Sequence, residues 1–216
     1  MTTQPPLIVI VGGFGGLAAA KEVKCSCVNV LLIDLSNHHV FQALLYQVAT
    51  SVLAPSQIAS PIRNLLANQA NTSVMLGNVT GVDATSKHVI VDANDKAGLK
   101  ISYDYLIFAT GANHSYFGHD EFAAFAPGLK SLADAEALRN HILEVFEKAE
   151  IEGDPERREA LMTFVMVGAG PTGVEIASAI AVMARTSLRR DFRRIDPTSA
   201  HVVLVDLGAR PLATFS

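Results

Sequence analysis

Two stretches of the chain share one pattern of apolar, small and helix-forming residues. Residues 8–20 read IVIVGGFGGLAAA, and residues 164–175 read FVMVGAGPTGVE. In each, a short β-branched run leads into glycines and then into residues that favour a helix. This order predicts a buried strand, a glycine-rich loop and a helix, which together open a parallel α/β unit. Because the pattern occurs twice, we expect two such units in one chain.

The first half of the chain continues with strands. Residues 28–34 predict a second strand that ends on an acid, and alternation after residue 72 predicts a small antiparallel ribbon with a turn at 94–98. The ribbon leads into a strand that ends at Gly111. The expected strands of this half are 7–11, 28–34, 73–84, 88–93 and 99–110, and the expected helices are 15–24 and 61–70.

The second half opens with the clearest helix. Residues 131–149 carry apolar side chains at helical spacing, and Ser131 with Asp134 predicts a capping box at the helix start. The polar run 151–159 is the best boundary in the chain. After it the first pattern returns, with strands expected at 163–167 and 201–206 and a helix at 174–185 or longer.

Composition narrows the class of protein. The chain has 216 residues, 50% of them hydrophobic, and a net charge of −4, which disfavours nucleic-acid binding. Strands that are buried on both faces account for the apolar share, and the alternative is a protein that rests on a membrane surface. No apolar run reaches the roughly 20 residues that span a bilayer, and the N-terminus lacks a signal-peptide core, so we expect an intracellular protein. Cys25 and Cys27 have no further cysteine to complete a metal set, which favours two buried or half-buried thiols.

The glycine loops have the chemistry of a phosphate site. A helix N-terminus presents unpaired N–H groups and a partial positive charge, and glycines let a pyrophosphate approach the backbone closely. The second loop matches GxGxxG with Gly168, Gly170 and Gly173. The first loop matches the variant GxGxxA with Gly13, Gly15 and Ala18.

Each unit also has an acid at the end of its second strand, where it can accept hydrogen bonds from a ribose. Asp34 follows Gly13 by 21 residues, close to the usual interval, whereas Asp206 follows Gly170 by 36. An acid at Asp206 favours a free 2′-hydroxyl, so we expect NADH rather than NADPH. The alternative is an aspartate that merely ends a strand.

Three longer segments have distinctive amino-acid sequences. They are NHHVFQALLYQVAT (37–50), YDYLIFATGA (103–112) and VGAGPTGVE (167–175). These segments resemble the type II NADH dehydrogenases, and the likeness covers roughly the first half of such an enzyme. It implies a truncated α/β chain of two Rossmann-like dinucleotide-binding units, similar to the pyridine nucleotide-disulfide oxidoreductases. The implied organisation is an FAD-binding unit with a ribbon at 1–118, a helical connection at 119–158 and the incomplete start of an NADH-binding unit at 159–216.

The resemblance implies where the cofactors FAD and NADH are held. The family carries three consecutive glycines before the phenylalanine of the first loop, and this chain has two. By carry-over, the backbone of Val79 contacts the adenine, and Thr110 and Gly111 lie near the flavin. The expected cofactor-binding residues are Gly12, Gly13, Phe14, Gly15, Gly16, Asp34, Val79, Thr110, Gly111, Gly168, Gly170, Gly173 and Asp206, and no metal ligand is expected.

Glu175 is the expected catalytic residue. It lies two residues past Gly173, where its carboxylate can point toward a bound nicotinamide. The family uses this glutamate at the flavin–nicotinamide contact, with a proposed part in proton or quinone handling. The alternative is a glutamate that is simply favoured near a helix N-terminus.

Three further groups of residues are weaker candidates for a functional role, because a structural role explains each of them. His38 and His39 are adjacent, which favours a loop role near FAD over a metal pair. The arginines between 185 and 194 favour a solvated helix face over a lipid or phosphate contact. Phe41, Leu44, Leu45 and Tyr46 are more often core residues than quinone contacts.

The expected activity is hydride transfer from NADH to FAD, with electrons passed on to a membrane quinone of a respiratory chain. The resemblance implies a peripheral protein at the cytoplasmic face of the membrane, attached through a C-terminal part that is missing here, and a homodimer. A chain that ended at Ser216 would be soluble. Two alternatives stay open: another two-dinucleotide flavoprotein reductase, for which the two cysteines are poorly placed, and a catalytically silent nucleotide-binding fragment.

Overall fold

The computed structural model describes residues 5–24 and 27–213 and divides into two compact units. Unit 1 consists of Met1–Val40 and Ala59–Asn113, and unit 2 consists of Phe41–Ile58 and His114–Ser216. The segment 41–58 therefore packs with the second unit, although its place in the sequence suggested the first. The functional roles of the ranges 1–118, 119–158 and 159–216 stay a prediction.

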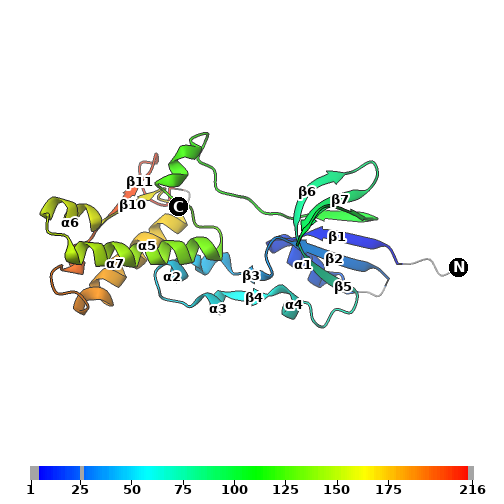
Figure 1. The fold of residues 1–216 in the computed structure, drawn as a ribbon, viewed down its shortest axis with the longest axis horizontal. Coiled ribbons are helices and arrows are strands. Elements are labelled where there is room, and N and C mark those ends of the chain that lie inside the picture. Colours follow the sequence, from blue (N-terminus) through cyan, green and yellow to red (C-terminus); the bar gives the residue numbers. More distant parts are fainter. Residues whose placement is uncertain (1–4, 25–26, 214–216) are drawn as a thin grey trace. The chain divides into compact units, whose positions relative to one another are not determined.

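Unit 1 is built on a parallel sheet with the strand order β5-β2-β1-β9. Figure 1 labels β5, β2 and β1 of this sheet. Its strands are β1 (Leu7–Val11), β2 (Asn29–Asp34), β5 (Thr72–Leu76) and β9 (Tyr105–Phe108). Helix α1 (Phe14–Glu22) connects β1 to β2, which confirms the predicted strand, glycine loop and helix. The carboxyl ends of β1 and β2 lie side by side, because Val11 pairs with Ile33 in a parallel register.

The ribbon is a separate antiparallel sheet of β6 (Asn78–Asp83), β7 (His88–Ala93) and β8 (Lys96–Ser102). The strand expected at 73–84 is split at Gly77, because β5 pairs with β2 whereas β6 pairs with β7. The turn between β7 and β8 is tighter than expected, and Asn94 adopts a left-handed φ of 51° there. A two-residue turn of this kind matches the twist of the paired strands.

Both faces of the parallel sheet are covered. Alternate residues of a strand point to opposite faces, and Ile10 packs with Leu17 of α1 and with Ile62 on one face. Val9 packs with Val89 of the ribbon on the other face. Burial on both faces explains why β1 and β2 read as nearly continuous apolar runs.

Unit 1 also contains a small pairing that the sequence did not indicate. Strand β3 (His38–Val40) pairs antiparallel with β4 (Ala59–Pro61), which precedes α4 (Ile62–Leu65). The helix expected at 61–70 is therefore only one turn long, since residue 66 already leaves the helix.

Unit 2 combines helices with a pair of parallel strands (Figure 1). The central helices are α5 (Leu132–Ile151) and α7 (Pro171–Arg185), and the strands are β10 (Thr163–Val167) and β11 (His201–Val205). The shorter helices are α2 (Leu45–Ala49), α3 (Pro55–Ile58) and α6 (Pro155–Leu161), with 3-10 turns at Gln42–Leu44, Asp120–Ala124, Leu188–Arg190 and Pro197–Ser199. Helix α6 occupies the polar run that was expected to be a boundary, where Asp154 caps it and Pro155 is its first residue.

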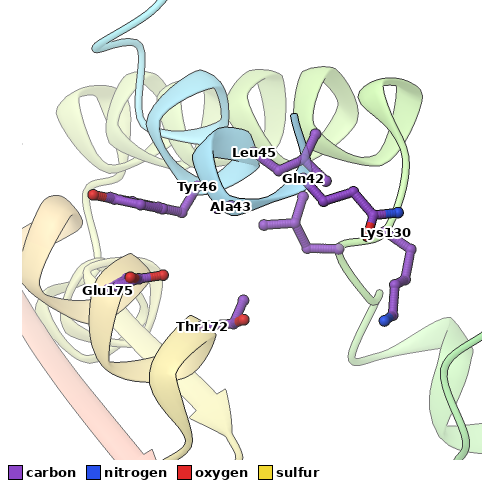
Figure 2. Close-up of a pocket in the computed structure, with 8 residues that line it drawn as sticks. Gln42, Ala43, Leu45, Tyr46, Lys130, Thr172 and Glu175 are labelled. Carbon is purple, nitrogen blue, oxygen red and sulfur yellow. The ribbon is translucent and has the colours of Figure 1, made fainter. Parts of the chain in front are cut away.

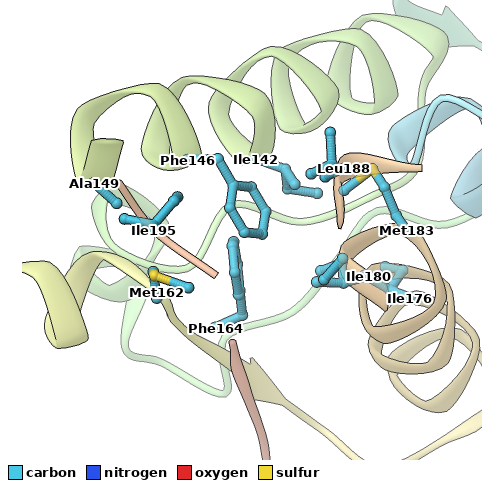
Figure 3. Close-up of a cluster of buried hydrophobic side chains, with 11 residues drawn as sticks. Ile142, Phe146, Ala149, Met162, Phe164, Ile176, Ile180, Met183, Leu188 and Ile195 are labelled. Atoms are coloured by element: carbon cyan, nitrogen blue, oxygen red, sulfur yellow. The ribbon is translucent and has the colours of Figure 1, made fainter. Parts of the chain in front are cut away.

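The core of unit 2 lies between α5, α7 and β10 (Figure 3). Phe146 of α5 and Phe164 of β10 meet with ring centroids 5.4 Å apart, and Ile180 of α7 is fully buried beside them. The opposite face of the two strands is not covered by the described residues. It carries the exposed side chains of Val165, Val167, Val203 and Val205.

The predicted capping box at the start of α5 is confirmed. The hydroxyl of Ser131 accepts a hydrogen bond from the Asp134 amide at 3.1 Å, and the Asp134 carboxylate accepts one from the Ser131 amide at 2.8 Å. Burial raises the pKa of Asp134, but the amides of Ser131 and Lys130 outweigh that effect, so its pKa lies below the ordinary value. The carboxylate therefore stays ionised as a cap at neutral pH.

Replacing Ser131 by alanine is expected to lower the free energy of unfolding of unit 2 by about 0.5–2 kcal/mol, because one helix amide loses its partner. Urea denaturation of both proteins measures this loss. Ser178→Ala is the matched control, since Ser178 is an exposed interior residue of α7 and alanine is the better helix former. Equal losses in the two variants would contradict the role of the cap.

Cys25 lies outside the described residues, so its predicted burial is not tested. Cys27 is exposed, which differs from the expected buried or half-buried thiol. None of the helices among the described residues combines the length and the apolar character that a membrane span requires.

Candidate functional site

The two glycine loops leave their sheets in the same way. The Gly12 amide donates to the carbonyl of Ile33 at 2.7 Å, and the Gly168 amide donates to the carbonyl of Val205 at 2.7 Å. Each bond adds one further rung to the parallel ladder of its unit. Gly12 and Gly168 are therefore equivalent positions.

The two helices that follow also start in the same way. The carbonyl of Gly13 accepts a hydrogen bond from the Leu17 amide at 3.1 Å, and that of Gly170 accepts one from the Val174 amide at 3.0 Å. Gly13 and Gly170 are the N-caps of α1 and α7. One residue, Ala169, separates the last ladder glycine from the cap in unit 2, and none does so in unit 1.

This equivalence changes the register that we assigned to the first loop. When Gly12 is aligned with Gly168 and Gly13 with Gly170, the first loop corresponds to GxGxxG with the residue between its first two glycines deleted. The three glycines of the motif are then Gly12, Gly13 and Gly16. Gly16 matches Gly173, because each lies three residues past its cap and a Cβ at either position would press against a backbone carbonyl oxygen, that of Val11 or that of Gly168. The register Gly13, Gly15 and Ala18 is therefore wrong. Matching the motif to the sequence placed the register wrongly because the neighbouring Gly15 satisfied the motif by chance.

The shortened loop is constrained at Gly13. Its φ is +97°, which L-residues rarely adopt, and a Cβ there would overlap the carbonyl oxygen of Ala109. The Gly170 cap has an ordinary φ of −74°. The missing residue of the first loop thus coincides with an unusual backbone at its cap.

The acids at the strand ends hold these loops. Asp34 Oδ2 accepts a hydrogen bond from the Gly13 amide at 3.0 Å, and Asp34 Oδ1 accepts one from the Ser36 amide at 2.8 Å. A carboxylate offers about four acceptor positions. Asp34 therefore keeps capacity to accept hydroxyl hydrogen bonds while it anchors the loop.

Asp206 repeats this arrangement in unit 2. Its Oδ2 accepts from the Ala169 amide at 2.6 Å, and its Oδ1 accepts from the Gly208 amide at 2.7 Å. The Ala169 amide, followed by that of Gly208, holds the pKa of Asp206 below its ordinary value. Asp206 is therefore a carboxylate at neutral pH.

The second loop leaves room beside its backbone. A Cβ added at Gly168 or Gly170 would meet no atom within 4 Å. The loop can therefore accept a phosphate group close to its amides at the N-terminus of α7, so its residues fit a dinucleotide.

The other residues of unit 1 that we expected to bind the cofactor differ in how close they lie to the first loop. The backbone of Ala109 and Thr110 borders the space that a Cβ at Gly13 would occupy, which places the AlaThrGly turn beside the loop. Gly111 follows with a φ of +74°. Phe14 is 54% exposed, and its ring lies 4.6 Å from that of His39. Val79 lies on β6 and packs with the ribbon cluster.

Glu175 lies in a cavity of about 210 Å³ within unit 2 (Figure 2). Thr172 and Glu175 project from the first turns of α7, and Tyr46 approaches from α2. Lys130 closes a further side at the start of α5. The lining residues are Gln42, Ala43, Leu45, Tyr46, Leu129, Lys130, Thr172 and Glu175.

Sequence reasoning missed most of this lining. Leu45 is buried as expected, but Tyr46 contacts both the core of unit 2 and the cavity, and its hydroxyl accepts a hydrogen bond from Gln47 at 2.9 Å. The signal was present as Gln42 and Tyr46, which flank the two adjacent leucines of a short apolar segment. It could not be used, because only the packing of segment 41–58 in unit 2 brings it near Glu175.

Within the described ranges, no three His, Cys, Asp or Glu side chains gather closely enough to bind a metal ion. His38 Nδ1 lies 3.0 Å from the hydroxyl of Ser36. Burial, followed by the charge of Lys21, lowers the pKa of His39, so that residue is neutral at pH 7.

Two glycine loops, each held by an acid-ended strand, define a two-dinucleotide α/β protein. The family profile described as pyridine nucleotide-disulphide oxidoreductase matches residues 5–216, and the chain belongs to that family.

Named relatives point to one branch of the family. The chain is 50% identical over 209 residues to the type II NADH:quinone oxidoreductase Ndh of Mycobacterium tuberculosis, which covers 95% of this chain and 45% of that protein. It is 30% identical to the external alternative NADH-ubiquinone oxidoreductase of Yarrowia lipolytica, covering 87% of this chain and 34% of that protein. The chain thus spans less than half the length of these relatives and matches their N-terminal portion, which confirms the resemblance to type II NADH dehydrogenases.

A solved structure shows the same fold. NDH2 from Plasmodium falciparum, determined in complex with NADH, superimposes with a TM-score of 0.90 at 25% identity. The match covers 98% of this chain and 44% of that one. The predicted class, an α/β chain with two dinucleotide-binding units, is confirmed.

Proposed function

We propose that this chain binds FAD at the glycine loop of unit 1 and NADH at that of unit 2, and serves an NADH:quinone oxidoreductase. The observation that carries the proposal is the repeated anchor, in which Asp34 and Asp206 each hold the loop amide and keep free acceptor positions. The names of the relatives support the same reaction.

When bound, the nicotinamide supplies a hydride and the flavin accepts it. The chain contributes binding and electrostatics. The loop amides and the N-terminus of α7 stabilise a diphosphate, and Asp206 accepts hydrogen bonds from a ribose. The corresponding residues of unit 1 bind FAD. They are Gly12, Gly13, Phe14, Gly15, Gly16, Asp34, Val79, Thr110 and Gly111.

Glu175 is the proposed catalytic residue. Its carboxylate lines the cavity beside Thr172, which lies two residues past the Gly170 cap. A dinucleotide whose diphosphate lies at that cap can extend its nicotinamide ribose along the first turns of α7. Glu175 is then placed to orient the nicotinamide and to hold or release a proton during turnover.

The electron acceptor in this proposal is a membrane quinone. We further propose a peripheral location at the cytoplasmic face of the membrane and a homodimer. Both would depend on parts of the relatives that have no counterpart in these 216 residues.

A comparison of NADH with NADPH tests the second site. The ionised Asp206 would face the 2′-phosphate of NADPH, so NADPH is expected to bind at least about tenfold more weakly than NADH. Titrations that follow nicotinamide fluorescence measure both affinities. Asp206→Asn is expected to reduce the preference, because the repelling charge is removed.

Asp191→Asn is the matched control, since Asp191 is an exposed aspartate of the same unit that lies away from the loop. It should leave both affinities unchanged. Equal affinity of the unaltered chain for the two nucleotides, or a preference that survives in Asp206→Asn, would count against the proposed site.

A further inference from the structure

Among the described residues that line the cavity, Lys130 is the only cation, and it lies across from Glu175, the only anion (Figure 2). Its side chain comes from the residue before the Ser131 cap of α5. Neither the hydrogen bonds nor the ion pairs between described residues involve its ammonium group. The charge of Lys130 is therefore available to a ligand.

The backbone of Lys130 is fixed even though its side chain is exposed. Its amide donates to Asp134 Oδ2 at 3.0 Å, next to the capping box. The start of α5 thus positions the Cα atom of Lys130, and the flexible side chain extends from a defined point on the wall of the cavity that Thr172 and Glu175 line from the other side. Because the backbone of Lys130 is already fixed, contact with a bound anion costs only the conformational entropy of its side chain.

The neighbouring loop lacks a cation of its own. Residues 168–173 read GAGPTG and carry no charged side chain. A dinucleotide diphosphate brings two negative charges to the cap of α7, and Glu175 adds a third nearby. The partial charge of a helix N-terminus is roughly half a unit. A flexible cation in the wall of the same cavity can therefore offset the repulsion that the loop alone does not neutralise.

We propose that Lys130 is a further NADH-binding residue, which contacts the diphosphate side of the dinucleotide and balances the charge of Glu175. This inference rests on the proposed function of unit 2. Because the side chain is exposed, its contribution is that of a solvent-screened contact and falls as salt rises.

NADH titrations of the 216-residue chain at low and high salt test this role. Lys130→Ala is expected to weaken NADH binding about three- to tenfold at low salt, which corresponds to one charge contact of about 0.7–1.4 kcal/mol, and to flatten the salt dependence. Lys130→Arg should restore most of the affinity, because it keeps the charge. The thermal midpoint of each variant should match that of the unaltered chain.

Lys148→Ala is the matched control. Lys148 also belongs to the α5 region, but it is paired with Glu144 at 2.9 Å on the helix surface and is absent from the lining of the cavity. Its loss should not change NADH affinity. If the unaltered chain binds NADH and Lys130→Ala binds it equally well at both salt concentrations, the role of Lys130 is overturned while the proposed NADH site stands. If the unaltered chain does not bind NADH, the proposed function itself is overturned.

Discussion

Replacing Gly13 by alanine is expected to abolish FAD binding by unit 1. The φ of +97° at this cap costs an L-residue about 1–3 kcal/mol. In addition, the new Cβ would overlap the carbonyl oxygen of Ala109, which is backbone and cannot rotate away. The loop would have to move off the end of β9 and would release the hydrogen bond from its amide to Asp34. Flavin absorbance after reconstitution and gel filtration measures the loss.

Gly98→Ala is the matched control for this prediction. Gly98 also has a positive φ, of +68°, but a Cβ there would meet no atom within 4 Å. It should cost stability of the ribbon without removing the flavin. Equal flavin retention by Gly13→Ala and Gly98→Ala would show that the first loop is not the FAD site.

Lengthening the shortened loop is expected to have the opposite effect, a gain in FAD affinity. Insertion of one glycine between Gly12 and Gly13 would restore the spacing that the second loop has between Gly168 and Gly170. The cap could then adopt an ordinary φ, and FAD affinity is expected to rise. No gain on insertion would mean that the deletion does not limit flavin binding.

Glu175→Gln is expected to slow turnover of NADH with a short-chain quinone by about a hundredfold, in the range that a positioned acid or base contributes. The flavin should be retained, because Glu175 belongs to unit 2 and the FAD loop to unit 1. Steady-state kinetics on the reconstituted chain, with flavin content measured on the same sample, provide the test.

Glu147→Gln is the matched control for Glu175, since Glu147 is exposed on α5 and does not line the cavity. Its turnover should equal that of the unaltered chain. Loss of the flavin in Glu175→Gln would refute the role assigned here, because the variant would then act through structure and not through the reaction.

The local repeats of the fold could be read from the sequence. Each β-branched run, glycine loop and helix is encoded in one continuous stretch, Leu7–Glu22 or Thr163–Arg185, and Asp34 and Asp206 mark the ends of the next strands. The capping box of α5 depends on two residues three positions apart, so it was also predictable. Such features depend on neighbours in sequence, and local chemistry decides them.

Features that depend on distant contacts could not be read in this way. Segment 41–58 packs against α5 and α7 in unit 2, and only that packing brings Tyr46 and Gln42 to the cavity of Glu175. The resemblance already indicated that one glycine of the first loop is missing, but the register of the remaining glycines became visible only when the hydrogen bonds of Gly12 and Gly13 were compared with those of Gly168 and Gly170. The one-residue ambiguity arose because Gly12, Gly13, Gly15 and Gly16 allow more than one match to the motif.

An anaerobic titration of the FAD-reconstituted chain with NADH tests the central claim most directly. If both loops hold their nucleotides, the flavin absorbance should bleach with one equivalent of NADH. A chain that keeps no flavin after gel filtration, or a bound flavin that NADH does not bleach, would contradict the account of two working dinucleotide sites.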